Sequence, residues 1–143
     1  MPQHYSEEDE VHFWFEAWKF NAEVSVVSEL MQLQPTKVMV AGEPNFKHPP
    51  GRKNHWNLWT FDSPLPMAAP TEEHLEVLIS VLEPRAEAIA TLVEVHQAEV
   101  GFRCVIHYRD WTPGIRFSPD IMRRLGNLNL AVELNLYLRE EEA

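Results

Sequence analysis

The chain has 143 residues, 45% hydrophobic and 24% charged, with a formal net charge of −10, which is typical of one soluble globular domain. No apolar run approaches the roughly 18 residues of a membrane span, and the acidic N-terminus lacks the cationic and apolar regions of a secretory signal. A single cysteine, Cys104, excludes an internal disulfide and fits a cytoplasmic protein.

The negative charge is concentrated at the two ends of the chain. Residues 7–10 and 140–142 hold seven of the 22 acidic groups, so residues 11–139 carry 15 acidic and 12 basic side chains. We therefore expect a single domain over 11–139 between acidic tails at 1–10 and 140–143. A body this close to neutral disfavours nucleic-acid binding, which requires a clustered cationic face.

Hydrophobic periodicity predicts strands and helices in alternation. In chain order the expected elements are strand 11–20, helix 21–35, short strand 36–42, strand 55–61, helix 71–82, strand 98–110, helix 118–126 and strand 128–139. Pro84 either kinks the central helix or begins a second segment over 84–95. Prolines within 43–54 and 63–70 indicate irregular connections.

The predicted order is β-α-β-β-α-β-α-β, and the strands alternate apolar and polar side chains. Strands of this kind are half-buried, which favours an α+β fold with helices on one face of a mainly antiparallel sheet. The first six elements match a ferredoxin-like two-layer sandwich, to which one helix and one strand are added. On the first strand, we expect Val11, Phe13, Phe15 and Ala17 to share one face.

Several short motifs stand in a defined order along the chain. They are Leu30, Leu33, Pro35 and Thr36 at a helix exit, Gly42 and Glu43 at a turn, Trp56 at a strand start, and Gly114, Phe117, Ser118, Pro119 and Asp120 at a helix entry. The pattern, over roughly residues 11–138, resembles a bacterial family of small domains of unknown function. The resemblance implies a fold and a bacterial, intracellular setting, and it implies no activity.

The residue types that carry catalysis do not form a catalytic pattern in this sequence. The seven histidines lack metal-ligand spacing and are expected on the surface. Cys104 shares a strand face with Phe102 and Ile106, so we expect it in the core. Ser118 stands in a helix-capping context, not in a nucleophile elbow. We therefore predict no catalytic residue, no metal and no cofactor.

The strand faces opposite the helices form a predicted surface rich in aromatic and basic residues. Its members are Trp14 and Trp18 of the first strand, Trp59 and Phe61 of the third, Arg103, His107 and Arg109 of the fourth, and Glu133, Asn135 and Tyr137 of the last. Trp56, with Leu58, is expected on the other face, in the core. Because Trp, Tyr and Arg are enriched at binding hot spots, this surface is the main candidate site.

The sequence is compatible with three occupants of this surface: a loop or terminus of the same chain, a second copy, or a separate partner or ligand. Loop 43–54 adds the basic residues Lys47, Arg52 and Lys53, either as a solvated tip or as part of a contact. We predict a non-enzymatic interaction module that forms a homodimer or binds a protein partner, with an immunity-like role as one form of this function. The alternative is a small enzyme or ligand-binding protein with a pocket at the sheet that uses His107, Arg109 and Glu133.

Overall fold

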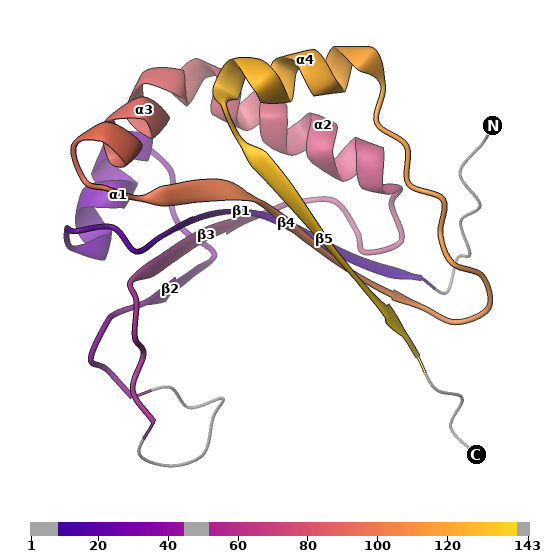
Figure 1. Cartoon of the computed structure of the whole chain (residues 1–143), viewed down its shortest axis with the longest axis horizontal. Helices are drawn as coiled ribbons and strands as arrows, with labels where there is room; N and C mark the ends of the chain where they lie inside the picture. The colour runs from indigo at the N-terminus through magenta and orange to yellow at the C-terminus, as the bar shows by residue number, and fades with distance from the viewer. Residues whose placement is uncertain (1–8, 45–51, 140–143) are drawn as a thin grey trace. The chain divides into compact units, whose positions relative to one another are not determined.

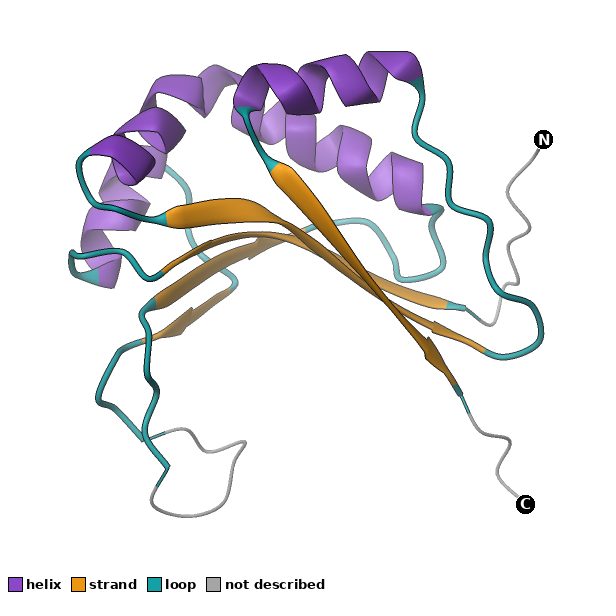
Figure 2. Ribbon diagram, in the orientation of Figure 1, coloured by secondary structure: helices purple, strands orange, loops and turns teal. Residues whose placement is uncertain are grey.

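The computed structural model describes residues 9–44 and 52–139, which form five strands, four α-helices and one short 3-10 turn (Figures 1 and 2). The elements are β1 (Glu10–Trp18), α1 (Val24–Met31), β2 (Lys37–Met39), β3 (Leu58–Asp62), α2 (Thr71–Leu82), η1 (Glu83–Arg85), α3 (Ala86–Glu94), β4 (Glu99–Tyr108), α4 (Pro119–Leu128) and β5 (Ala131–Leu138). The predicted α+β class is confirmed.

The five strands form one mainly antiparallel sheet in the order β2-β3-β1-β4-β5. β2 and β3 are antiparallel, whereas β4 and β5 are parallel, from Gly101 opposite Ala131 to Tyr108 opposite Leu138. The predicted order of elements is wrong in one place, because α3 is a separate helix between α2 and β4. Pro84, in the short 3-10 turn η1, has no backbone N–H to continue the α-helical pattern. The ferredoxin-like description stays a prediction.

The chain divides into two compact units, and β1 and β4 each contribute residues to both. The β5 unit consists of residues 9–15, 62–84 and 101–139, and the β3 unit of residues 16–44, 52–61 and 85–100. The expected single domain over 11–139 stays a prediction, and most of the two acidic tails (1–8 and 140–143) lies outside the described residues.

The core of the β5 unit is formed by α2 and α4 on the strands beneath them (Figure 1). Its buried side chains are Val11, Phe13 and Phe15 of β1, Phe102, Cys104 and Ile106 of β4, Leu75, Leu78, Ile79 and Leu82 of α2, and Ile121, Leu125 and Leu128 of α4. The β1 and β4 residues alternate with half-buried ones, as the sequence pattern predicts for one face of a strand. Burial raises the pKa of the Cys104 thiol to about 12.

The ends of α4 show how local residue types set its length. The Ser118 hydroxyl accepts the backbone N–H of Ile121 at 3.2 Å, and Pro119 takes the first helical position, both as predicted. The predicted end at Gly126 is wrong, because the helix continues to Leu128. Asn129 ends it in the left-handed conformation, which asparagine tolerates. β5 therefore begins three residues later than the expected strand.

The core of the β3 unit lies around Trp59, whose side chain is completely buried. The Trp59 indole N–H donates to the hydroxyl of Ser28 on α1 at 3.0 Å. Arg85 joins the helical segments of this unit, because its Nε donates to the carbonyl of Met31 at the end of α1 at 2.6 Å. Other buried side chains of this core are Phe20, Val27, Met31, Ile89, Leu92 and Ala98.

The predicted positions of the two neighbouring tryptophans, Trp56 and Trp59, are the wrong way round. Trp59 is 0% exposed and Trp56 is 52% exposed. β3 begins only at Leu58, so Trp56 lies in the preceding loop, where strand alternation does not apply. Asn57 is the last residue of this loop, and its side chain anchors the loop by donating to the carbonyls of Phe20 and Ala22. Burying the large Trp59 ring removes more apolar surface from water than burying a leucine would. The indole N–H of Trp59 also keeps a hydrogen-bond partner in the core.

Candidate functional site

Within the β5 unit, the structure brings together five of the residues predicted for the surface opposite the helices. Arg103 Nη1 lies 3.0 Å from Glu133 Oε2, across β4 and β5. The His107 ring stacks on Tyr137 at 5.6 Å, and it meets His12 of β1 edge-to-face at 5.9 Å. Aromatic side chains therefore run across three neighbouring strands. Asn135 also lies on this surface and donates to Glu133 at 3.3 Å; Trp14 is half-buried.

Other predicted surface residues lie elsewhere. Trp18 and Phe61 belong to the β3 unit, and Trp59 is in its core, so the predicted surface position of Trp59 is wrong. Arg109 follows the end of β4 and is exposed. In the loop, Arg52 and Lys53 are exposed, and Lys47 lies outside the described residues.

The three residues of the enzyme alternative, His107, Arg109 and Glu133, do not form a common site. In the register of β4 and β5, His107 pairs with Tyr137 and Arg103 pairs with Glu133. His107 and Glu133 are thus four positions apart along the strands, about 13 Å at the usual rise per residue. Within the described ranges, no three His, Cys, Asp or Glu side chains lie together as metal ligands would.

β5 exposes a row of apolar side chains at the edge of the sheet. Leu134, Leu136, Tyr137 and Leu138 are 36%, 40%, 52% and 61% exposed. Leu130, just before β5, is buried, whereas Leu134, Leu136 and Leu138 share its face of the strand and become more exposed toward the end of β5.

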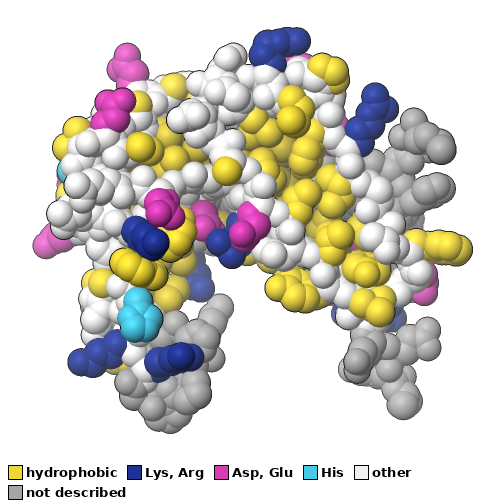
Figure 3. Space-filling model, in the orientation of Figure 1, with side chains coloured by type: hydrophobic (Ala, Val, Ile, Leu, Met, Phe, Trp, Pro, Cys, Tyr) yellow, Lys and Arg dark blue, Asp and Glu magenta, His cyan; other side chains and the backbone are white. Residues whose placement is uncertain are grey.

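An apolar groove of about 410 Å³ continues this row between β5 and α4, where hydrophobic side chains gather in Figure 3. Its lining residues are Phe117, Met122, Leu125, Gly126, Leu130, Val132 and Leu134. None of these residues carries a charge, so the groove and the exposed Leu134, Leu136 and Leu138 form one apolar surface, whereas Tyr137 lies on the opposite face beside His107.

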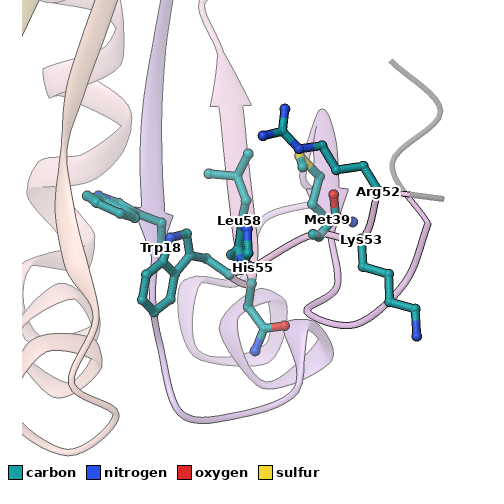
Figure 4. Close-up of a pocket in the computed structure, with 9 residues that line it drawn as sticks. Trp18, Met39, Arg52, Lys53, His55 and Leu58 are labelled. Atoms are coloured by element: carbon teal, nitrogen blue, oxygen red, sulfur yellow. The ribbon is translucent and has the colours of Figure 1, made fainter. Parts of the chain in front are cut away.

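The β3 unit holds a second candidate, a cavity of about 230 Å³ beside the exposed Trp56 (Figure 4). The rings of Trp18 and Trp56 meet edge-to-face at 6.4 Å. The Lys19 ammonium lies 4.5 Å from the Trp18 ring and 4.7 Å from the Trp56 ring. The cavity is lined by Trp18, Met39, Arg52, Lys53, Asn54, His55, Trp56, Asn57 and Leu58. Sequence reasoning missed this site because it assigned Trp56 to the core.

His74 of α2 is a buried polar residue that the sequence placed on the surface. It is 1% exposed, and its ring stacks on Phe13 at 6.4 Å. Its Nδ1 lies 2.6 Å from the hydroxyl oxygen of Ser63. Burial lowers the pKa of His74, an effect that the carboxylate of Glu73 opposes in part. This histidine is part of the core.

The fold and these surfaces together define a small α+β protein with an exposed sheet edge and an aromatic cavity. Residues 9–139 match the family described as "Domain of unknown function (DUF4279)", and the chain belongs to that family. No curated protein and no solved structure matches the chain. Bacterial origin and the motifs of the resemblance stay predictions. Within 9–44 and 52–139, no helix has the length and apolar character needed to cross a membrane.

Proposed function

We propose that this protein is a non-enzymatic interaction module that associates with a second copy of itself by antiparallel pairing of β5 with β5. The observation that supports this function is the long apolar strand β5 at an open edge of the sheet. An edge strand offers unpaired backbone N–H and C=O groups to another strand. The exposed leucines of β5 add apolar surface to that backbone pairing.

The two edges of the sheet differ in the features that normally protect an edge from pairing. β2 has three residues and carries Lys37, and short, charged edges resist association. β5 has eight residues, Ala131–Leu138, with no lysine and no proline. Its exposed leucines belong to the surface that includes the groove beside α4. β5 is therefore the edge suited to a partner strand.

The direction of the β5 backbone groups shows which residues can bond to a partner strand. The N–H of Arg139 donates to the carbonyl of Tyr108 in β4 at 2.7 Å. Because backbone groups alternate sides along a strand, the N–H groups of Leu134, Leu136 and Leu138 point to the open edge. Two copies related by a two-fold axis at Asn135 pair Leu134 with Leu136 of the other copy through these groups.

The side chains are also complementary in this register. Leu134 opposes Leu136 and Val132 opposes Leu138, so both pairs are apolar. Glu133 opposes Tyr137, with no like charge across from it. A two-fold axis at Glu133 would place two glutamates opposite each other, which is destabilising. The charge pattern of β5 therefore favours the axis at Asn135 over one at Glu133.

A cysteine at the two-fold axis tests this pairing directly. Residue 135 faces its own copy in a non-hydrogen-bonded pair, where the Cα atoms are about 4.5 Å apart and a disulfide can form. We expect Asn135→Cys to give a disulfide-linked dimer of twice 16.6 kDa on mild oxidation. Because the native Cys104 is buried, we expect little cross-linking through it. Leu134→Cys is the matched control, because its own copy is about 7–8 Å away.

Light scattering on the unmodified chain measures the association itself. We expect a dimer whose mass returns to that of a monomer in Leu136→Lys, because this change places two like charges near the two-fold axis. Val95→Lys, at a 67% exposed position in the β3 unit, is expected to leave the mass unchanged. A wild-type monomer at all concentrations, or equal cross-linking in the Leu134→Cys and Asn135→Cys variants, would overturn the proposal.

If the wild-type chain is a monomer at all concentrations, binding of a different protein along β5 becomes the favoured function. The immunity-like role and the bacterial, cytoplasmic setting inferred from the sequence belong to this second candidate. The observation that supports it is the same open strand edge, since strand addition also serves hetero-complexes. The partner would then be a polypeptide with an exposed strand of its own.

A further inference from the structure

The cavity of the β3 unit has features of a ligand site that are separate from β5. One side is formed by Trp18, the other by Arg52 and Lys53, and Leu58 lies between them (Figure 4). None of the nine lining residues is acidic. The cavity thus combines flat apolar walls with positive charge at its rim, and ligand sites usually pair apolar walls with a few polar groups.

Backbone hydrogen bonds hold the aromatic wall in place. Lys19 adopts a left-handed conformation with φ of 58°, which costs a non-glycine residue roughly 1–2 kcal/mol. Its N–H donates to the carbonyl of Asn57 at 3.1 Å, which joins the end of β1 to the residue after Trp56. The Asn57 side-chain oxygen accepts the N–H of Ala41 at 2.9 Å. A wall fixed in this way loses little entropy when a ligand binds.

The charges decide which ligand fits. Two indoles at this angle resemble part of an aromatic cage, which usually receives a cation. Here the ammonium of Lys19, which lies 3.7 Å from a carboxylate oxygen of Glu99, already lies over both rings. Arg52 and Lys53 place two further positive charges on the cavity lining, which contains no acidic residue. A cationic ligand would be repelled, whereas an anion would gain charge-assisted hydrogen bonds.

The volume and the walls of the cavity further limit the class of ligand that can bind. About 230 Å³ is smaller than the roughly 300–1,000 Å³ of most drug-sized sites, so the ligand is about one ring in size. Its flat body would stack on indole, and its anionic group would reach the guanidinium of Arg52. We infer that this cavity binds a small aromatic carboxylate, with the ring against Trp18 and Trp56 and the carboxylate at Arg52.

Phenylacetate is the probe for the first test. It is titrated into the full chain while the indole N–H signals are followed by NMR, with the Trp56 signal assigned from Trp56→Phe. We expect a saturable shift of that signal and about tenfold weaker binding in Arg52→Gln, which removes a charged hydrogen-bond donor. Arg123→Gln, an exposed arginine of the β5 unit, is the matched control and should bind as the wild type does.

Changes to the probe separate this inference from simple apolar binding. Phenylacetamide keeps the ring but loses the charge, and we expect it to bind about tenfold more weakly than phenylacetate. Acetate lacks the ring and should give no saturable shift. Equal binding of phenylacetamide, an unchanged affinity in Arg52→Gln, or tighter binding of tetramethylammonium would overturn the inference. The titration of the Leu136→Lys variant, which lacks the proposed β5 contact, should match the wild type.

Discussion

The Nδ1 atom of His74 lies 2.6 Å from the hydroxyl oxygen of Ser63, in the core of the β5 unit. The other ring nitrogen, Nε2, is buried and has no hydrogen-bond partner among the described residues. A charged imidazolium needs partners for both N–H groups, so this environment favours the neutral ring. The stacked Phe13 ring strengthens that preference, because an apolar neighbour cannot solvate a charge.

The first prediction concerns the pH dependence of stability. The pKa of His74 is lowered from 6.5 in the folded chain, chiefly by burial, with Glu73 opposing and His12 adding to the shift. As pH falls below about 6.5, the unfolded chain binds a proton before the folded one does, so the free energy of unfolding decreases by up to about 1.4 kcal/mol per pH unit. We expect His74→Phe to lose this component in urea titrations between pH 7 and the folded pKa.

The exposed His55 supplies the control for this experiment. His55→Gln, a change at an exposed histidine, is the matched control and is compared with the wild type in the same titrations. A His74→Phe variant whose stability falls with acid as steeply as that of the wild type would show that His74 does not titrate differently on unfolding.

The second prediction compares the two tryptophans on either side of Leu58. Trp59→Ala should reduce the free energy of unfolding by about 3–5 kcal/mol, because it leaves a cavity in the core of the β3 unit. Trp56→Ala should cost less than about 1 kcal/mol, since that side chain is half exposed. Urea denaturation followed by circular dichroism measures both. Similar losses in the two variants would contradict the burial described here.

The third prediction concerns Arg124 of α4, whose guanidinium joins α4 to α2. It donates to both oxygens of Glu76 at 2.7 and 2.8 Å, to Glu83 at 3.1 Å and to Ser80 at 3.2 Å. A lysine cannot reproduce this fork of donors, so Arg124→Lys should destabilise the chain by about 1 kcal/mol. The neighbouring Arg123, paired with Asp120 at 3.3 Å and well exposed, should tolerate lysine within about 0.5 kcal/mol.

Acid should reduce this difference between the two arginines. Hydrogen bonds from Arg124 lower the pKa of Glu83 from 4.5. The stabilisation that the Arg124–Glu83 contact gives the folded chain is fully present above pH 4.5. It is lost as pH falls through the lowered pKa of Glu83 in the folded chain. Thermal denaturation of Arg124→Lys and wild type should therefore converge below pH 4.5. An undiminished difference in acid would show that Arg124 acts through packing alone.

The fourth prediction concerns the close approach of β4 and β5 at Gly101. A Cβ at this position would lie 3.0 Å from the carbonyl oxygen of Ala131, the first residue of β5. Gly101→Ala should therefore cost about 1–3 kcal/mol, because backbone must move to admit the methyl group. Gly114→Ala is the control, since its added Cβ has no atom of the described residues within 4 Å apart from its chain neighbours. Equal stability of the two variants in urea would contradict this backbone geometry.

Local pattern was sufficient for much of the fold. The alternation in residues 11–17 predicted which β1 side chains are buried, and Val11, Phe13, Phe15 and Ala17 are all in the core. Ser118 and Pro119 predicted the start of α4 for a similarly local reason, because a cap and a fixed φ act within one turn. The buried face of β1 and the start of α4 both depend on residues that are close together in the chain, so they can be read from the sequence.

The candidate site depended on information that periodicity does not contain. The residues of the β5 unit surface, such as His107 and Tyr137, were grouped correctly because alternation holds along their strands. The Trp18 and Trp56 cavity was missed, because its existence depends on where β3 begins. One shift of that boundary moves Trp56 from an expected core position to a loop.

The sequence by itself thus determined the α+β class, the positions of most strands and helices, and the inward face of β1, since each follows from spacing within one element. Tertiary structure alone decided that Trp59 is buried under α1, that His74 is in the core, and that Leu136 stays exposed. These outcomes depend on which strand ends the sheet and which residues distant in sequence meet. The pairing of strands determines both the edge of the sheet and these distant contacts, and no single segment of the sequence encodes that pairing.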